Sequence, residues 1–237
     1  MTTEQHAIIL QRIRDCVRDV QLAVYSTGQA ARYHVGKARD MVRDPKKLAV
    51  LADVTDTSAH QRLLRDLIDQ IEAMDLQADD AWVNEDHDAL AKARAALSDL
   101  YDKVGLRPSA YERLVRQFET PRLNEARRAC ALSSDDPLRR RLERLLRMSA
   151  EDFVQLVGRI AERMNQIDSD RDAFARDHRQ FAETYVRSLG RDDRISLAAA
   201  FLATRRAVNY FDDRRGYKFT DYATSWIDRE LARVGSE

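Results

Sequence analysis

The segment YFDDRRGYKFTDYATSWIDREL, residues 210–231, interleaves aromatic and basic side chains in a chain that is only 7% aromatic. Flat rings can stack on unpaired bases, and arginine or lysine can contact the neighbouring phosphates. This combination predicts an interface for a single strand of nucleic acid. The residues expected at that interface are Arg205, Arg206, Arg214, Arg215, Tyr217, Lys218, Phe219, Tyr222, Trp226, Arg229 and Arg233.

The same aromatic residues have a second interpretation, as part of a hydrophobic core. On a helix that begins near Thr220, Tyr222 and Trp226 lie four residues apart and share one face. The neighbouring aliphatic stripe must face the core, and it consists of Ile227, Leu231 and Val234. If the aromatic rings join that core, the arginines form only its solvated rim. The sequence leaves both interpretations open.

Residues suited to catalysis or metal binding are scattered along the chain. The five histidines, at positions 6, 34, 60, 87 and 178, form no spaced pair with a carboxylate or a cysteine. The sequence contains no glycine-rich phosphate loop and no nucleophile elbow. Cys16 and Cys130 lack metal-ligand spacing. We therefore expect no enzymatic activity, no metal and no cofactor.

The charge of the chain is balanced overall but uneven along its length. With 40 basic and 40 acidic residues, any affinity for nucleic acid must come from a local patch. Residues 107–147 carry 11 basic and 6 acidic side chains, so positive charge gathers in the centre. No apolar run approaches the ~18 residues of a membrane span, and the N-terminus lacks a signal-peptide core. Together with the two unpaired cysteines, this predicts a cytoplasmic protein with no membrane partner.

Helices are predicted throughout, because the sequence is rich in helix-forming residues and only seven Gly and four Pro interrupt it. Periodicity and end signals predict helices over 8–27, 29–43, 63–74, 88–104, 108–118, 121–131, 136–147, 149–189, 193–211 and 220–234. The acidic run QADDAWVNEDHD is predicted to be a loop. Four end signals are expected: closure at Gly105, positive φ at Gly216, a capping box from Ser149 to Asp152, and a cap at Thr220 or Asp221.

The run RRAVNYFDDRRGYKFTDYATSWI, residues 205–227, resembles the segment of sigma-70 family transcription initiation factors that recognises and melts the minus-ten promoter element. The string RRGYKF, followed by YAT and WI, carries most of this likeness. Two upstream stretches are more weakly similar. LRMSAEDFVQLVGRIAERM resembles the helix that enters region 2 of primary sigma factors, and LYDKVGLRPSAYERLVRQFE resembles their non-conserved region.

The resemblance implies an all-α fold, a sigma-70 region-2-like helical bundle with an extended helical N-terminal part. It implies three parts: a helical N-terminal part of unknown role at 1–90, a segment resembling the non-conserved region at 91–148, and a region-2-like domain at 149–237. It also implies two partners, the RNA polymerase core and promoter DNA. The DNA would lie against the basic and aromatic residues named above.

Several positions depart from the sigma pattern. The helix that carries acidic and amide residues for the polymerase in that family reads RISLAAAFLATRRAV here, and the tandem tryptophan is replaced by Ser225-Trp226. Acidic residues at 213, 221 and 228 would repel a phosphate backbone. Arg229 stands where the family reads a base. The chain ends at Glu237 without a helix-turn-helix, so a companion transcription factor is expected to supply sequence recognition.

Two functions follow from the resemblance. The first is a sigma-like transcription regulator, an activator that associates with RNA polymerase and promoter DNA beside a companion DNA-binding protein. The second is a sigma-fold decoy or scaffold that binds polymerase or a regulatory partner without contacting DNA. The retained aromatic residues favour the first function. The Ala-rich segment 195–203 and the three aspartates favour the second.

Overall fold

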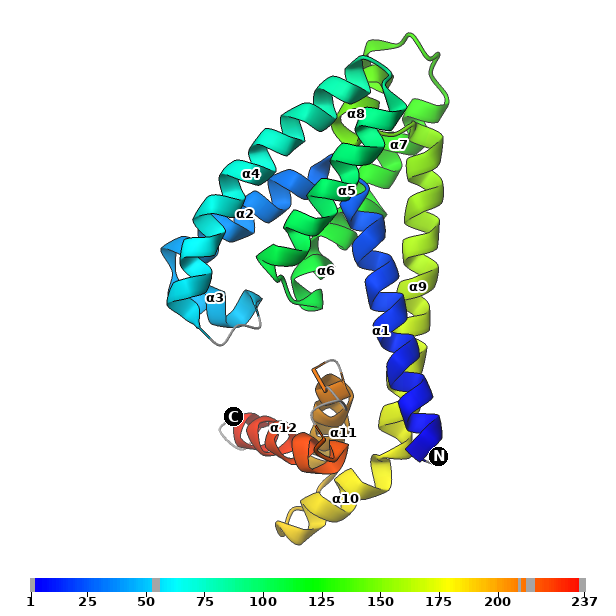
Figure 1. The fold of residues 1–237 in the computed structure, drawn as a ribbon. Helices are drawn as coiled ribbons and strands as arrows, with labels where there is room; N and C mark the ends of the chain where they lie inside the picture. Colours follow the sequence, from blue (N-terminus) through cyan, green and yellow to red (C-terminus); the bar gives the residue numbers. More distant parts are fainter. Residues whose placement is uncertain (1–2, 53–55, 209, 212–215, 235–237) are drawn as a thin grey trace. The chain divides into compact units, whose positions relative to one another are not determined.

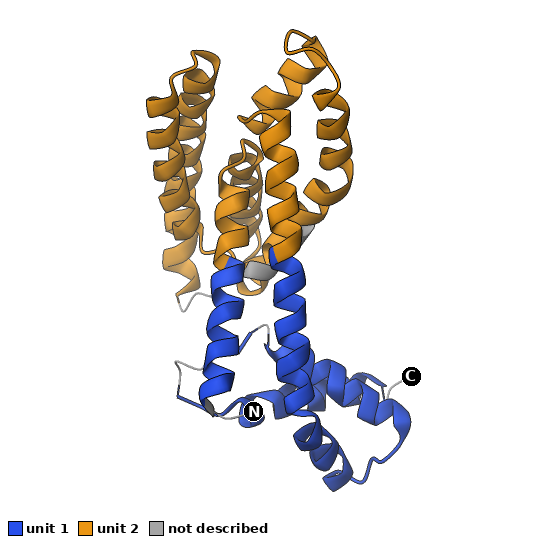
Figure 2. Ribbon diagram, turned by 90° about the vertical axis from the view of Figure 1, so that its right-hand side faces the viewer, with its two compact units in different colours: residues 1–17, 163–237 blue, residues 18–162 orange. Residues whose placement is uncertain are grey.

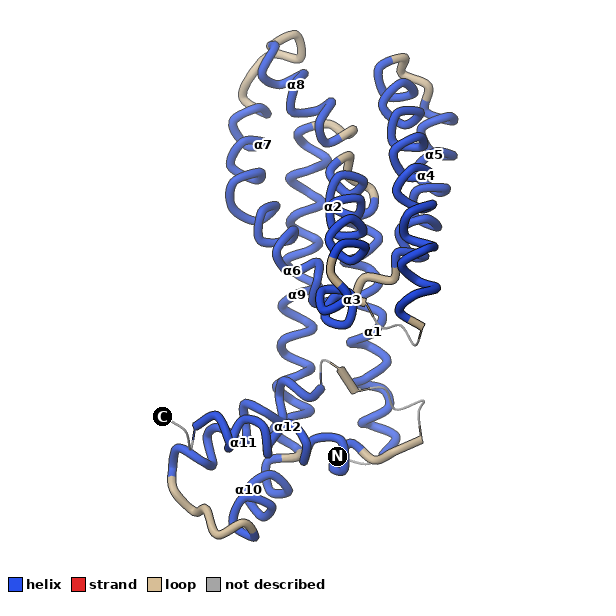
Figure 3. Tube along the Cα trace, turned by 90° about the vertical axis from the view of Figure 1, so that its left-hand side faces the viewer, coloured by secondary structure: helices blue, strands red, loops and turns tan. Residues whose placement is uncertain are grey.

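The computed structural model describes residues 3–52, 56–208, 210–211 and 216–234. Every regular element in these residues is a helix, which confirms the all-α fold (Figures 1 and 3). The elements are α1 (Thr3–Tyr25), α2 (Gln29–Arg43), α3 (Pro45–Leu51), α4 (Thr57–Val83), α5 (His87–Val104), α6 (Pro108–Gln117), the π-helix η1 (Phe118–Arg122), α7 (Leu123–Cys130), α8 (Pro137–Leu146), α9 (Ala150–Asp177), α10 (Arg179–Ser188), α11 (Arg194–Val208) and α12 (Phe219–Val234).

The helices form two compact units (Figure 2). Unit 1 contains residues 1–17 and 163–237, and unit 2 contains residues 18–162. Helices α1 and α9 each contribute residues to both units. The division at residues 90 and 148 that the sigma resemblance implies stays a prediction.

Unit 2 contains a helical hairpin of α4 and α5, with α2 packed against α4 (Figure 3). Leu64, Leu67 and Ile71 recur at helical spacing on α4 and are fully buried. Glu85, at φ 56°, turns the chain between the two helices. The side chain of Asp86 then accepts a hydrogen bond from the Ala89 amide and caps α5.

Four buried ring residues of unit 2 form what we call the buried aromatic cluster: Tyr25, His34, Tyr101 and Tyr111. They come from α1, α2, α5 and α6 respectively. The His34 ring stacks on Tyr101, with 4.1 Å between centroids, and the Tyr25 ring meets Tyr101 edge-on at 5.1 Å. His34 Nδ1 lies 2.7 Å from the carbonyl oxygen of Ala30, so Nδ1 donates this bond. The rings therefore hold four helices of unit 2 together.

Hydrogen bonds link this cluster to the protein surface. The Tyr111 hydroxyl lies 2.9 Å from His34 Nε2 and 2.9 Å from the Tyr25 hydroxyl. Tyr25 donates to the Asp102 carboxylate at 3.0 Å, and Arg18 donates two bonds of 2.7 Å to the same carboxylate. Burial raises the pKa of Tyr25 to about 12, so its hydroxyl stays protonated at neutral pH.

In unit 1, α10, α11 and α12 share a core of small and aliphatic residues: Ala182, Val186, Ala199, Ala200, Ala203, Ile227 and Leu231. The prediction that Ile227 and Leu231 face the core is confirmed, and Val234 packs against its edge. Alanines on α11 allow α12 to approach closely, because they carry no side chain beyond Cβ. The Ala-rich sequence of α11 therefore has a structural role.

The predicted loop over the acidic run QADDAWVNEDHD is wrong, because α4 continues to Val83. Ala78 and Ala81 are buried and extend the apolar stripe of Ile71 by further helical turns. Of the two aspartates of this run on α4, Asp80 is exposed, whereas Asp79 is partly buried and pairs with Arg144 of α8. Only residues 84–86 separate α4 from α5.

The predicted helix over 149–189 is also wrong, since it is divided at His178 into α9 and α10. His178 has φ −92° and ψ 7°, outside the helical well. The predicted capping box at the start of α9 is confirmed in part: Ser149 Oγ accepts a 3.0 Å hydrogen bond from the Asp152 amide. Positive φ angles of 70° at Gly105 and 77° at Gly216 confirm both glycine predictions.

Three smaller differences concern helix starts. Helix α12 begins at Phe219, so Thr220 and Asp221 lie in its first turn and do not cap it. The short helix α3 was not predicted; Pro45 occupies its first turn and Asp44 caps it through the Lys46 amide. The helix predicted from 121 begins at Leu123, because Pro121 cannot donate an α-helical hydrogen bond and lies in η1.

Candidate nucleic-acid interface

Six aromatic side chains from the end of α11 to the middle of α12 form a continuous group in unit 1. We call it the aromatic row, and it consists of Tyr210, Phe211, Tyr217, Phe219, Tyr222 and Trp226. Tyr210 stacks on Trp226, with 5.0 Å between centroids and 13° between planes. Tyr217 stacks on Tyr222 at 5.9 Å, and Tyr222 lies 6.3 Å from Trp226. Spacing on α12 brings Tyr222 and Trp226 to one face, as predicted.

Exposure divides the row into two kinds of residue. Phe219 is 6% exposed and packs edge-on against Phe174 at 4.9 Å and His178 at 4.7 Å. Phe219 is therefore a core residue, in agreement with the second interpretation of the sequence. Tyr210 and Tyr217 are 42% and 37% exposed, while Tyr222 and Trp226 are half-buried. These four rings leave part of their surface open to a base.

Three of the predicted cations make ion pairs within the protein. Arg205 pairs with Asp172 and lies 3.5 Å from Asp168. Arg206 and Arg233 both contact Glu230, at 3.0 and 2.7 Å. The hydrogen bond from Arg233 is the main reason that the pKa of Glu230 lies below its ordinary value. A phosphate would have to compete with these carboxylates.

Two other predicted cations are placed differently. The Arg229 guanidinium lies over the Trp226 ring, 5.6 Å from its centroid, and the exposed Lys218 lies just before α12. Within the described part of the chain, neither makes an ion pair. Arg214 and Arg215 fall outside the described residues. Lys218 and Arg229 are therefore the described cations best placed beside the aromatic row.

The acidic residues near the row have local structural roles. Asp221 occupies the first turn of α12, where a negative charge interacts favourably with the helix dipole. Asp228 accepts a 2.8 Å hydrogen bond from the Tyr185 hydroxyl of α10. Asp213 falls outside the described residues. Asp221 and Asp228 thus contribute to the fold of unit 1 whether or not DNA binds.

One cluster that sequence reasoning missed lies where α1 meets the junction of α9 and α10. His6 Nε2 lies 2.6 Å from Asp177 Oδ2, and the ring centroids of His6 and His178 are 4.7 Å apart. His6 comes from a distant part of the chain, so no sequence spacing could predict this contact. Arg12, which donates to the buried Asp170 at 2.6 Å, helps hold α1 beside α9.

This cluster offers two imidazoles and one carboxylate, whose ligand atoms lie within 4.8 Å of one another. Two ligand atoms bound to a tetrahedral zinc at about 2.0–2.2 Å would lie roughly 3.3 Å from each other, which is closer than the 4.8 Å within which the ligand atoms of this cluster lie. His178 Nδ1 donates to the Phe174 carbonyl oxygen at 2.9 Å, and burial lowers the His178 pKa. The cluster therefore acts in this structure as a packed, hydrogen-bonded support for Phe174 and, through it, for Phe219.

Among the described residues, no helix is long and apolar enough to cross a membrane. No protein-family model matches this chain, and a comparison with curated proteins finds no match.

Proposed function

We propose that this protein is a sigma-like transcription regulator, an activator that associates with the RNA polymerase core and with promoter DNA in the cytoplasm. In this proposal the aromatic row holds an unpaired strand, and a companion transcription factor supplies sequence recognition. The observation that supports it is the exposed pair of ring stacks, Tyr210 with Trp226 and Tyr217 with Tyr222. These rings belong to the segment that resembles the promoter-melting part of sigma-70 factors.

The energetics favour the rings over the arginines as the source of affinity. A base that stacks on an aromatic side chain contributes about 1–3 kcal/mol. By contrast, Arg206 and Arg233 must share or leave Glu230 before they can contact a phosphate. Among the predicted cations that the structure describes, Lys218 and Arg229 could do so at little cost. We therefore expect moderate affinity for a single strand and a shallow dependence on salt.

A second function, a sigma-fold decoy or scaffold without DNA contact, is favoured by a different observation. Ile195 and Leu202 of α11 are 67% and 48% exposed. They line a groove of about 400 Å³ together with Val234 of α12. Apolar side chains on the helix that contacts polymerase in sigma factors suit a different protein partner.

Co-purification from the native cell tests whether polymerase is a partner at all. The tagged protein is expected to retain polymerase core subunits after nuclease treatment, because the proposed contact does not depend on DNA. Loss of these subunits after nuclease would contradict a direct contact. Retention of polymerase by a protein that binds no single strand would favour the decoy.

A set of arginine variants tests the role of DNA. The change Arg214→Glu with Arg215→Glu, combined with Arg205→Gln and Arg206→Gln, is expected to lower promoter output about tenfold, mainly because glutamate at 214 and 215 would repel phosphates. Glutamine is used at 205 and 206 because glutamate would repel the carboxylates that these arginines now contact. The matched control is Arg179→Gln with Arg187→Gln, which removes two ion-paired arginines from α10. Unchanged output from a folded fourfold variant would argue strongly against the proposal.

A further inference from the structure

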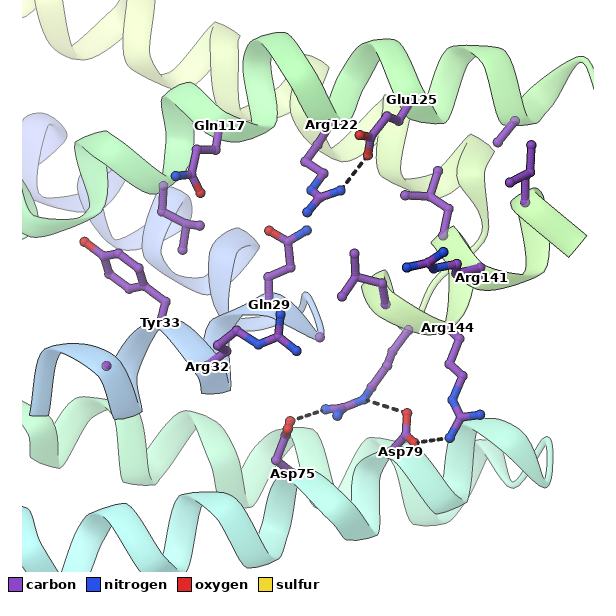
Figure 4. Close-up of a pocket in the computed structure, with 18 of the residues that line it drawn as sticks. Gln29, Arg32, Tyr33, Asp75, Asp79, Gln117, Arg122, Glu125, Arg141 and Arg144 are labelled. Atoms are coloured by element: carbon purple, nitrogen blue, oxygen red, sulfur yellow. Dashed lines mark hydrogen bonds and ion pairs between the residues drawn. The ribbon is translucent and has the colours of Figure 1, made fainter. Parts of the chain in front are cut away.

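A large basic cleft lies in unit 2, within the residues that the sigma resemblance leaves without a role or assigns to a non-conserved region. Its volume is about 1420 Å³, and α2, α4, α6, η1, α7 and α8 provide its walls (Figure 4). Seven basic residues line it: Arg32, Lys37, Arg122, Arg128, Arg141, Arg144 and Arg147. The acidic lining residues are Asp40, Asp75, Asp79 and Glu125. The cleft therefore carries an excess of positive charge.

The ion pairs of the cleft leave part of this positive charge uncompensated. Arg144 contacts Asp79 at 2.7 Å, Arg147 contacts Asp75 at 2.5 Å, and Arg122 contacts Glu125 at 2.6 Å. In the part of the chain that the structure describes, four other cations make no ion pair: Arg32, Lys37, Arg128 and Arg141. Figure 4 shows the side chains of Arg32 and Arg141 reaching the space from different walls.

Two buried polar groups of the cleft also lack hydrogen-bond partners. The Arg147 side chain is only 9% exposed, and its Nε makes no hydrogen bond, although it lies 3.9 Å from Asp79. The Gln29 side-chain amide nitrogen is buried and has no acceptor. Unpaired buried donors are costly, and a ligand with several acceptor oxygens would satisfy them. Both donors belong to residues that line the cleft.

The beginning of α2 adds a fixed positive end to this site. Its first turn carries no acidic residue, and no side chain caps it. Gly28, just before the helix, donates a 2.8 Å hydrogen bond to the Leu146 carbonyl oxygen. A Cβ at Gly28 would lie 2.5 Å from the Leu145 carbonyl oxygen, so only glycine allows this approach. The helix end is thereby held against the end of α8.

The remaining lining residues are largely apolar. They include Tyr33, Leu114, Leu132, Leu138 and Leu142. A pocket that joins several cations to leucine and tyrosine side chains suits a ligand with multiple negative charges and an apolar or aromatic part. A ligand with charged oxygens alone would leave the leucine and tyrosine side chains of the cleft without an apolar contact.

We propose that this cleft binds a small organic polyphosphate of the nucleoside polyphosphate class. The phosphates contact Arg32, Arg141 and the buried donors of Gln29 and Arg147, and the base packs on the apolar wall. The carboxylates among the lining residues and the concave shape disfavour the continuous backbone of a nucleic acid. This site is independent of the function proposed for the aromatic row.

Isothermal titration of the full chain with adenosine triphosphate and with inorganic triphosphate tests this proposal. We expect one site, with adenosine triphosphate binding at least tenfold more tightly than inorganic triphosphate because of the apolar wall. The variant Arg32→Gln with Arg141→Gln is expected to raise the Kd about 100-fold, roughly tenfold for each lost charge-assisted contact. The matched control is Arg62→Gln with Arg65→Gln, two exposed arginines of α4 outside the cleft.

Three outcomes would overturn the proposal. The first is no measurable binding of either ligand at millimolar concentration. The second is equal loss of binding in the cleft variant and its control, with both shown to be folded by circular dichroism. The third is displacement of the bound nucleotide by a single-stranded or duplex oligonucleotide, which would assign the cleft to nucleic acid. Equal affinity for the two ligands would contradict the nucleoside part of the proposal.

Discussion

The two aromatic groups of this protein use similar side chains in opposite ways. The buried aromatic cluster of unit 2 encloses its rings, and hydrogen bonds link Tyr25, Tyr111 and His34. The aromatic row of unit 1 leaves Tyr210 and Tyr217 more than one-third exposed. Among the described residues, the row's tyrosine hydroxyls make no hydrogen bond with protein. Three of the enclosed rings, Tyr25, His34 and Tyr111, have their polar atoms paired inside the fold, whereas the exposed tyrosines of the row leave their hydroxyls to solvent.

The largest expected difference between the two groups concerns stability. Tyr101→Ala should lower the free energy of unfolding by about 3–5 kcal/mol, because it opens a cavity beneath the His34 ring. Tyr217→Ala should cost less than about 1 kcal/mol, because its ring is exposed. Urea unfolding measures both variants. Tyr101→Phe, which keeps the ring, is the control and should remain close to the native stability.

Similar costs for Tyr101→Ala and Tyr217→Ala would break the comparison, since Tyr217 would then belong to a core.

The second prediction concerns the pH dependence of stability. Burial lowers the pKa of His34 from its ordinary value of 6.5 to about 4. Between these values the unfolded chain binds a proton that the folded chain does not, so stability falls as pH decreases from about 6.5 to 4. The full effect is about 3 kcal/mol, at about 1.4 kcal/mol per pKa unit. Denaturation measured from pH 7.5 to 4 should show it.

The control for this measurement is His34→Gln, which cannot take up the proton. Lowered pKa values at His178 and Asp102 add to the acid sensitivity of both proteins, so the difference between the two curves isolates His34. If the difference in free energy of unfolding between the native protein and His34→Gln does not change with pH, His34 titrates normally and is not enclosed.

The third prediction concerns binding and has the smallest effect on the fold. Tyr222→Ala should weaken binding to a minus-ten-like single strand by about 1–3 kcal/mol, because a stacking surface is lost. Because Tyr222 is half-buried, the loss of stability should be clearly below that of Tyr101→Ala. Fluorescence anisotropy and thermal unfolding are measured on the same variant. Full binding by a destabilised variant would place Tyr222 with the core residues.

Features encoded by neighbouring residues could be predicted from the sequence. The periodicity of the chain and the Asp44-Pro45 pair predict α2 with the bounds that the structure has. Gly105 and Gly216 adopt the positive φ expected from their positions after or before a helix. The aliphatic stripe of Ile227 and Leu231 identified the core face of α12. Each of these signals lies within a few residues of the feature that it predicts.

Features that depend on distant contacts could not be predicted. The acidic run after Ile71 resembles a loop unless Ala78 and Ala81 are known to face another helix. The contact of His6 with Asp177 joins residues far apart in sequence. The basic cleft likewise gathers arginines from several helices, although the positive charge of residues 107–147 hinted at it. The structural role of small residues and of scattered charged residues depends on which helices pack together.

The hydrogen-bonded path from His34 to Asp102 has a consequence for the direction of its bonds. Three contacts connect His34, Tyr111, Tyr25 and Asp102, but when His34 is neutral the two hydroxyls provide only two protons for them. One contact must therefore always lack a hydrogen. Because Tyr25 already donates to Asp102, a proton added at His34 Nε2 would supply the missing hydrogen and turn the Tyr111 hydroxyl from His34 toward Tyr25. The core of unit 2 thus contains one hydroxyl, that of Tyr111, with two possible orientations, and a single proton at His34 selects between them.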